Sequence, residues 1–500
     1  MKDTARTSAS HPLQIASVQP WPGSGLIGLT FCPGKKQPNA ATGAWDRDLD
    51  TDVAAIAKWD AAAVVTLVED HELAALAVPD LGKVVAAHHM DWFHLPIPDV
   101  SVPPAAFEAG WNAVGEGLRS RLRNGFNILV HCKGGLGRAG TIASRLMIEL
   151  GVPPREAVDK VRKARPGAIE TAAQLAYVMA QKAVPEPEPS TSGDAVRDRA
   201  IGALLGLAVG DALGTTLEFK ARDSYPRLTD MVGGGPFRLK AGEWTDDTAM
   251  ALALADSLSG NPALDEADLM RRFVDWHEEG AYSCTGTCFD IGITTRQALS
   301  RWKASGNPIA GSTDPQTAGN GSLMRLAPVA IRHFRDRASL RDVAARQSRT
   351  THAAPEAVDA CVTYAEVLAD AIEGRKRSEV LRERLEPASG AIAGIMAGSW
   401  RGKPRKSVKA SGYVAHSLEA SLWSVGRTGD FASAVLLAAN LGEDADTTGA
   451  ITGQLAGSIY GTSAIPSRWL EKLALRPRII TMADGLWHAH GDIPAPKTPE

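Results

Sequence analysis

The sequence VHCKGGLGRAGT, residues 130–141, decides the fold of the N-terminal part of this 500-residue chain. The apolar, β-branched segment Asn127–His131 suits a buried strand, and the residues from about Arg138 onward have helical spacing. A glycine-rich loop between a strand and a helix turns its backbone N–H groups toward an anion, and the helix N-terminus adds positive potential. The stretch therefore predicts a phosphate-binding loop.

Cys132 lies at the base of this loop, where the same positive potential favours the thiolate form. Arg138 has the planar fork that grips phosphate oxygens. The loop residues expected around the phosphate are Lys133, Gly134, Gly135, Leu136 and Gly137. A thiolate in a phosphate cradle predicts catalysis through a phosphocysteine intermediate. The alternative is that Cys132 is only a small buried residue after a strand, as most cysteines are.

Strand-like and helix-like segments alternate on both sides of this loop. Ala62–Val68 suits a second buried strand, and helical spacing follows Thr141, so the N-terminal part is predicted to be an α/β unit. The Pro-Glu repeat that begins at Val184 is typical of an extended linker. We therefore divide the chain into a unit of residues 1–183, a linker of residues 184–194 and a unit of residues 195–500.

The C-terminal part is rich in alanine at helical spacing and is predicted to be all-helical. It contains two glycine ladders with a spacing of four, namely Gly202, Gly206, Gly210, Gly214 and Gly449, Gly453, Gly457, Gly461. Glycine costs about 1 kcal/mol per helical position, so such a stripe indicates two closely packed helices. Charges beside the ladders, such as Asp211 and Asp446, argue against a membrane helix.

Three acidic clusters lie within or beside these helices, in the segments 210–219, 242–250 and 442–449. Asp and Thr at a helix start are ordinary caps, and that alternative is strong for each cluster alone. Capping does not explain paired acids without a neighbouring cation, whereas two divalent ions would neutralise about five carboxylates. Because the ladders would bring the clusters together, we predict a site for Mg²⁺, Mn²⁺ or Ca²⁺.

The N-terminal unit resembles the protein tyrosine/dual-specificity phosphatases, most closely the kinase-associated phosphatase branch. The matching motifs are the Cys132 loop, GLTFCPGKK at 28–36, LPIPDV at 95–100 and GAIET at 167–171. The resemblance implies that Asp99 is the general acid, which protonates the leaving oxygen and then deprotonates the attacking water. Without the cysteine loop, Asp99 would be read as a turn residue after Pro98. The chain departs from the family at Ala139, where a Ser or Thr hydroxyl usually supports the departing thiolate. Thr141 is a candidate to replace it.

The C-terminal clusters resemble those of the ADP-ribosylglycohydrolase family, whose all-helical fold holds two Mg²⁺ or Mn²⁺ ions. The resemblance implies the metal ligands Glu218, Thr245, Asp246, Asp247, Asp444, Asp446 and Thr447. It implies no cofactor for the N-terminal unit.

Three further features extend this resemblance. The loop GNGSLMR, residues 319–325, resembles one that holds the ADP-ribose phosphates and distal ribose, through Asn320, Gly321 and Ser322. His352 resembles a histidine that contacts ribose. Asp290 in the segment FDIG resembles the aspartate that assists ribose-ring opening in the dinitrogenase-reductase-activating branch, which favours an arginine N-glycoside as the substrate.

The composition restricts the partners. Lys and Arg number 54 against 57 Asp and Glu, a net charge of −3, which argues against general nucleic-acid binding. Five cysteines fit a reducing compartment, so we expect a cytoplasmic protein, and the absence of a long uninterrupted apolar run predicts no membrane span. The expected substrates are an ADP-ribosylated protein or nucleotide and a phosphorylated molecule, while the oligomeric state stays open.

Three hypotheses follow for the whole chain. The first is a bifunctional hydrolase, in which a cysteine phosphatase is joined to a metal-dependent ADP-ribosylglycohydrolase. In the second, the phosphatase-like unit binds phosphorylated targets with little turnover, as Ala139 allows. In the third, the helical unit only binds nucleotide-like ligands, which the retention of every expected metal ligand argues against.

Overall fold

The structure is a computed structural model that describes residues 5–40 and 43–488. The outer ends of the predicted units, residues 1–4 and 489–500, lie outside the described residues. The chain divides into two compact units: the first ends at Glu186 and also includes Gly426–Gly429, and the second contains the rest of the chain from Pro187.

The first unit is built on a five-stranded sheet with the strand order β1-β2-β7-β5-β6. β1 is antiparallel to β2 and the other neighbours are parallel, so the sheet is mixed. Its strands are Ala16–Val18 (β1), Ile27–Phe31 (β2), Ala61–Thr66 (β5), Asp91–His94 (β6) and Asn127–Cys132 (β7). Lys36–Gln37 (β3) and Trp45–Asp46 (β4) form a separate two-stranded ribbon. The strands predicted from Ala62 and from Asn127 are confirmed as β5 and β7.

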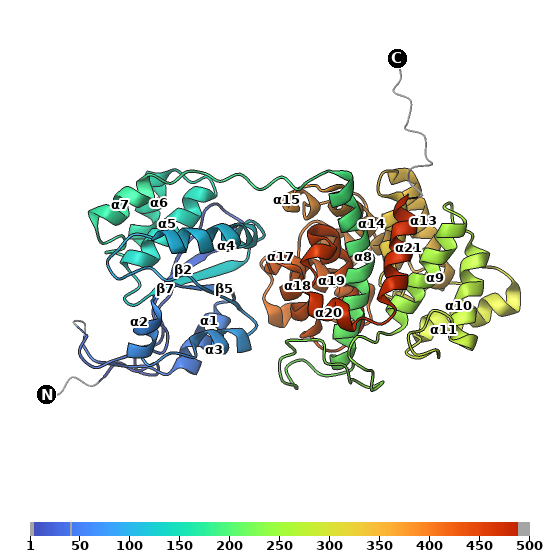
Figure 1. Cartoon of the computed structure of the whole chain (residues 1–500), viewed down its shortest axis with the longest axis horizontal. Helices are drawn as coiled ribbons and strands as arrows, with labels where there is room; N and C mark the ends of the chain where they lie inside the picture. Colours follow the sequence, from blue (N-terminus) through green and yellow to red (C-terminus); the bar gives the residue numbers. More distant parts are fainter. Residues whose placement is uncertain (1–4, 41–42, 489–500) are drawn as a thin grey trace, which may run out of the picture. The chain divides into compact units, whose positions relative to one another are not determined.

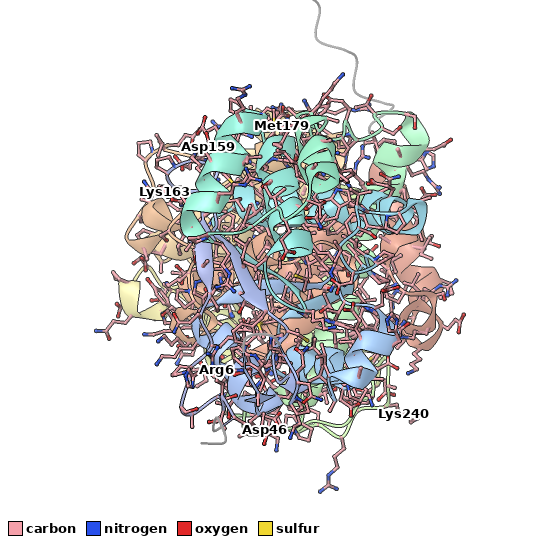
Figure 2. All side chains as sticks on the ribbon, turned by 90° about the vertical axis from the view of Figure 1, so that its left-hand side faces the viewer. Arg6, Asp46, Asp159, Lys163, Met179 and Lys240 are labelled. Atoms are coloured by element: carbon pink, nitrogen blue, oxygen red, sulfur yellow. The ribbon has the colours of Figure 1, made fainter. Side chains whose placement is uncertain are left out.

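Helices cover both faces of this sheet (Figure 1). They are Leu49–Lys58 (α1), Asp70–Ala75 (α2), Leu81–Ala87 (α3), Ala105–Arg123 (α4), Gly137–Glu149 (α5), Pro154–Ala164 (α6) and Ala172–Met179 (α7). Successive strand residues point to opposite faces, so Val65 and Val130 enter the core with α4 to α7, while Val64 and Leu129 enter the core with α1 to α3. Figure 2 looks onto this unit and labels Asp159 and Lys163 on α6 and Met179 at the end of α7.

The second unit is helical, as predicted. Its helices are Gly193–Gly214 (α8), Asp246–Gly260 (α9), Glu266–Glu279 (α10), Ile293–Ser305 (α11), Ala327–His333 (α12), Arg337–Thr351 (α13), Pro355–Glu373 (α14), Arg377–Val380 (α15), Ala391–Met396 (α16), Val414–Arg427 (α17), Phe431–Ala439 (α18), Ala445–Tyr460 (α19), Ser467–Lys472 (α20) and Arg476–His488 (α21). α8 and α19 lie side by side at its centre (Figure 1).

The two glycine ladders face each other along α8 and α19. A Cβ atom built on Gly202 would lie 2.5 Å from the Gly457 carbonyl oxygen, and one on Gly206 would lie 2.2 Å from that of Gly453. One on Gly210 would lie 2.1 Å from the Gly449 oxygen. The pairing runs in opposite directions along the two helices, so they are antiparallel, and no side chain fits between them.

The chain from Gly193 to Leu217 is long and apolar enough to cross a membrane by length and composition alone. However, 94% of its most apolar 18-residue stretch is buried inside the protein. Its burial against α19 is that of a central core helix. The antiparallel packing also places the C-terminal end of α8 beside the N-terminal end of α19, where the acidic clusters lie.

Candidate active sites

The loop after β7 has the backbone of an anion cradle. Cys132 is buried at the end of β7, and the Gly135 N–H donates to its Sγ atom at 3.2 Å. Gly135 has a φ of +72°, and a Cβ atom there would lie 2.5 Å from the Thr30 carbonyl carbon, so only glycine fits. Arg165 donates to the carbonyls of Gly135 (3.2 Å) and Gly134 (3.4 Å), which holds the outside of the loop.

Arg138 is buried in the first turn of α5 and is held by two carboxylates. Glu72 on α2 accepts from both terminal nitrogens, at 2.5 and 3.0 Å, and the Ile97 carbonyl accepts at 2.9 Å. Asp99, which is 54% exposed, lies 3.0 Å from Arg138 through its Oδ1 atom. Burial lowers the proton affinity of this guanidinium, but its bonds to Glu72 and the nearby Cys132 and Asp99 raise the pKa overall. The structure thus brings Asp99 and Arg138 together at the loop.

The residue after Arg138 offers no hydroxyl group. Ala139 is fully buried, and the Thr141 hydroxyl donates to the Gly137 carbonyl at 2.8 Å, within its own helix. Thr141 therefore does not replace the missing hydroxyl in this structure, because its proton is already engaged one turn back along α5.

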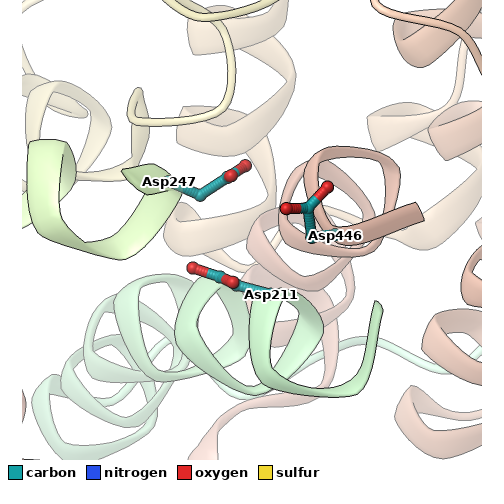
Figure 3. A group of neighbouring side chains, drawn as sticks. All are labelled: Asp211, Asp247 and Asp446. Carbon is teal, nitrogen blue, oxygen red and sulfur yellow. The ribbon is translucent and has the colours of Figure 1, made fainter. Parts of the chain in front are cut away.

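The second site is a cluster of carboxylates at three helix ends. Three groups of oxygen atoms each lie within 4.8 Å of one another, and Asp446 belongs to all three. They are Asp211, Asp247 and Asp446; Glu218, Asp444 and Asp446; and Asp246, Asp290 and Asp446. Figure 3 shows Asp211, Asp247 and Asp446 pointing toward one another from α8, α9 and α19. The Thr245 hydroxyl lies among them, 2.9 Å from Asp211 and 3.1 Å from Asp446.

Acids from neighbouring segments cap the first turns of α9 and α19. Thr245 and Asp444 occupy the N-cap positions of α9 and α19, yet neither makes a side-chain cap hydrogen bond. Asp211 caps α9 instead, because it accepts from the Thr245 N–H (2.9 Å) and the Thr248 N–H (3.0 Å). Glu218 likewise accepts from the Ala445 N–H at 2.8 Å. Neighbouring segments thus supply much of the capping, and Asp446 also accepts from the Thr447 N–H of its own helix at 2.7 Å.

The cluster concentrates carboxyl groups in a buried site, and this raises their pKa values. Burial and the repulsion from Asp446 raise the pKa of Asp211 and of Asp444 to about 7, and that of Asp290 rises to about 11 through burial, Asp246 and Asp446. The same causes raise the pKa of Glu218. Burial, and to a lesser extent repulsion from neighbouring aspartates, raises the pKa of Asp246 and of Asp247. Carboxylates that repel one another in a buried site require positive charge or protons.

The donor set fits divalent cations. It consists of carboxylate and hydroxyl oxygens, which are the ligands that Mg²⁺ and Mn²⁺ prefer. The Oδ1 atom of Asp247 is buried without a hydrogen-bond partner among the described residues, which leaves an acceptor for an ion. Thr447 also borders the cluster, and its hydroxyl donates to Asp247 Oδ2 at 3.4 Å.

A cavity of about 620 Å³ opens beside the cluster. Its lining includes the acids Glu218, Asp246, Asp290, Asp444 and Asp446 together with Thr447, Gly319, Asn320, Gly321 and His352. Asn320 donates to Asp444 Oδ2 at 2.6 Å, so it also orients that carboxylate. Burial lowers the pKa of His352 to about 3, which keeps the ring neutral, and Cβ atoms at Gly319 or Gly321 would crowd that ring.

Ser322 is not in the cavity lining. Its hydroxyl is fully buried, lies 2.8 Å from that of Ser348 and accepts from the Cys361 thiol at 3.4 Å. The loop therefore turns the Ser322 side chain into the core, while Asn320 and Gly321 line the cavity.

Two residues in these sites were not predicted from the sequence. The sequence shows Asp211 as a charge beside a glycine ladder, and its place between Gly210 and an apolar turn is a signal for a buried role. Glu72, which holds Arg138, is 66 residues away along the chain and belongs to no motif.

The folds and sites define a hydrolase of two units, an α/β cysteine-phosphatase domain followed by an all-helical glycohydrolase domain. A family model for ADP-ribosylglycohydrolase matches residues 192–494, and one described as "Swiss Army Knife protein, DSP-PTPase phosphatase domain" matches residues 43–178. The chain belongs to the ADP-ribosylglycohydrolase family and carries a dual-specificity-type phosphatase domain ahead of it.

Individual relatives match one unit or the other. An ADP-ribosylarginine hydrolase Tri1 of Serratia proteamaculans is 46% identical over 58% of this chain and 79% of its own length. The ADP-ribosyl-[dinitrogen reductase] glycohydrolase of Rhodospirillum rubrum is 36% identical over 57% of this chain and 93% of its own length. A solved ADP-ribosylglycohydrolase-related protein complex matches with a TM-score of 0.53 and 41% identity, over 59% of this chain and 98% of that one. The cyclin-dependent kinase inhibitor 3 of Sus scrofa is 30% identical over 31% of this chain and 71% of its own length.

Proposed function

We propose that the C-terminal unit removes ADP-ribose from modified arginine side chains. The observation that carries this proposal is the cluster of acids beside one 620 Å³ cavity, whose wall includes Glu218, Asp246, Asp290, Asp444 and Asp446. The arginine linkage is supported by the relative from Serratia proteamaculans, which is an ADP-ribosylarginine hydrolase. In the reaction, water adds its oxygen to the anomeric carbon, the bond to the guanidine nitrogen breaks, and that nitrogen takes a proton.

Two divalent cations, Mg²⁺ or Mn²⁺, would be held by the ligands expected from the sequence together with Asp211. When bound, these ions supply positive charge and Lewis acidity at the cavity wall. Asp290 faces the same cavity and is positioned to move a proton at the ribose. Asn320, Gly321 and the neutral His352 line the same cavity and would bind the remainder of ADP-ribose through backbone and ring contacts.

The experiment is a release assay on proteins that carry ADP-ribose on arginine or on serine, and on a nucleic acid that carries it on a base. We expect free ADP-ribose from the arginine substrate with wild type and Cys132→Ser, and none with Asp246→Ala. Preference for another linkage would overturn the arginine assignment. Activity that survives chelation would overturn the metal assignment, whereas inactivity of the metal-loaded wild type on every substrate would favour a unit that only binds ligands.

For the N-terminal unit, we propose hydrolysis of phosphate monoesters through Cys132. Its thiolate attacks phosphorus while Arg138 holds the phosphate oxygens, and Asp99 gives a proton to the departing oxygen. Water then attacks the phosphocysteine, Asp99 takes the proton, and the electron pair of the S–P bond returns to Cys132. The cradle geometry at Gly135 and the clamp of Glu72 on Arg138 support this role.

Ala139 supports a second candidate, a unit that captures phosphorylated targets and turns over slowly. The two candidates differ in the kinetics of a chromogenic phosphate ester. A burst of one product per Cys132 followed by negligible turnover would favour capture, and sustained turnover would favour a phosphatase. Ala139→Ser is expected to increase the steady-state rate if breakdown of phosphocysteine limits it.

Fusion of the two units suggests that they act on one doubly modified target, because a tether raises the local concentration of one product near the other site. The test compares wild type with Cys132→Ser on a protein that carries both phosphate and ADP-ribose. Identical processing of this doubly modified protein by the two enzymes would contradict a shared target.

A further inference from the structure

A buried lysine in the segment between β2 and β3 contacts the phosphate loop. Lys35 is only 5% exposed, and its Nζ atom donates to the Lys133 carbonyl at 3.4 Å. Lys133 directly follows Cys132, and Phe31 on β2 is paired with Cys132 on β7. The ammonium therefore lies against a carbonyl at the start of the loop that follows the nucleophile.

Aromatic rings fix the position of this ammonium. Nζ of Lys35 lies 4.9 Å from the centre of the Phe31 ring and 4.4 Å from that of Trp45. Both distances are within the range of cation–π attraction, which is stronger when the cation is desolvated. A lysine side chain is costly to bury, so its confinement between two rings and a carbonyl points to a specific role.

The charged and titratable groups facing Lys35 are Cys32, Arg47, Cys132 and Lys133. Burial lowers the pKa of Lys35 to about 8, with Arg47 and Lys133 acting in the same direction and the two cysteines opposing them. The side chain consequently keeps its proton at neutral pH. Arg47 is itself bound by Asp52 at 2.7 and 2.8 Å, so much of its charge is balanced.

We propose that Lys35 is a positioning residue of the phosphatase unit, whose ammonium holds the Lys133 peptide and stabilises the Cys132 thiolate. The ammonium takes the place of the hydroxyl group that Ala139 lacks. Thr141 does not supply that group, because its own hydroxyl donates to the Gly137 carbonyl. The inference rests on the proposed phosphatase function. Its effect is greatest in the second step, when the S–P bond breaks and its electron pair becomes the thiolate charge on Cys132.

The direct test is the pH dependence of Cys132 alkylation by iodoacetamide, followed by mass spectrometry of the peptide in the full chain. Lys35→Met removes the charge, Lys35→Gln retains a donor for the Lys133 carbonyl, and Lys35→Arg retains the charge. At pH 6 we expect alkylation to slow about tenfold in the Met and Gln variants and to stay near wild type in Arg, as for loss of a nearby opposite charge.

The matched control is Lys36→Met. Lys36 is the next residue, but its side chain is 56% exposed and pairs with Asp46, which is labelled at the surface in Figure 2. This control should leave the alkylation profile unchanged. A folded Lys35→Gln or Lys35→Met protein with the wild-type profile would overturn the inference, as would an equal change in Lys36→Met. If both neutral variants fail to fold, Lys35→Arg decides the question. Alkylation in Lys35→Arg that is about tenfold slower than in wild type at pH 6, although the charge is retained, would also overturn the inference.

Turnover gives a second readout. With a chromogenic phosphate ester, Lys35→Gln is expected to keep the burst and lose about tenfold in kcat, and adding Ala139→Ser should restore part of kcat. An unchanged kcat in Lys35→Gln, beside a wild type that turns over, would contradict the role in the second step. A wild type without turnover would instead refute the phosphatase proposal, while the alkylation profile would still decide whether Lys35 stabilises the thiolate.

Discussion

The contact between the glycine ladders can be tested at Gly210, which precedes Asp211. In Gly210→Ala the new Cβ atom would lie 2.1 Å from the Gly449 oxygen, 2.5 Å from the Gly449 carbon and 2.9 Å from the Ala450 nitrogen. All three are backbone atoms, so no side chain can rotate away. α8 and α19 would have to separate by about 1 Å to restore ordinary contact distances.

The expected loss follows from two opposing terms. Forcing an atom into a packed core costs about 3 kcal/mol at so close a contact, and replacing a helical glycine by alanine offsets about 1 kcal/mol. The net loss of about 2 kcal/mol corresponds to a fall of about 4–8 °C in the Tm of a unit of this size. Because α8 carries Asp211 and α19 carries Asp446, the separation should also weaken Mn²⁺ binding about tenfold or more.

Calorimetry of the full chain and titration with Mn²⁺ measure both effects. Gly485→Ala in α21 is the matched control, because nothing lies within 4 Å of a Cβ atom built there. It should raise the unfolding free energy by up to about 1 kcal/mol and leave Mn²⁺ affinity unchanged. A Gly210→Ala protein that melts at or above the wild-type temperature and binds Mn²⁺ normally would refute the backbone-to-backbone packing.

Three further predictions concern single sites. Asp211→Asn should lower Mn²⁺ affinity and the rate of ADP-ribose release by about 100-fold, measured by titration and product assay, while the exposed Asp265→Asn should change neither. In metal-free protein, Asp211 and Asp444 have folded-state pKa values of about 7, above the ordinary 3.8. Because the native state then binds more protons than the unfolded state between about pH 4 and 7, the Tm should fall as the pH rises through that window. Mn²⁺ should abolish this fall. Glu72→Gln should loosen Arg138 and raise KM for a phosphate ester about tenfold with a smaller change in kcat, and an unaltered KM would show that the clamp is not required.

Local patterns made part of the molecule predictable. The strands ending at Thr66 and Cys132 were predictable because each is a short β-branched run. The two central helices were predictable because glycine repeated at a spacing of four lines one helix face and indicates close packing. The acids of the second site were found for a similar reason, since they are concentrated at two helix starts.

Interactions between distant segments account for what was missed. Asp211 caps α9 from another helix, and Glu72 reaches Arg138 from α2; neither pairing leaves a local pattern in the sequence. The inward direction of the Ser322 side chain was not predictable either, because a glycine-rich loop does not reveal which of its side chains turns into the core. Lys35 belongs to a motif that matches the phosphatases, but its burial against Phe31 and Trp45 depends on the fold.

The central claim is that the carboxylate cluster removes ADP-ribose from arginine with the help of divalent cations. The most direct measurement is the release of free ADP-ribose from a protein modified on arginine, by the full chain with Mn²⁺, with a chelator, and after Mn²⁺ is restored. The account predicts release, loss and recovery for wild type, and no release by Asp246→Ala under any condition. Release that is insensitive to the chelator, or that persists in Asp246→Ala, would contradict it.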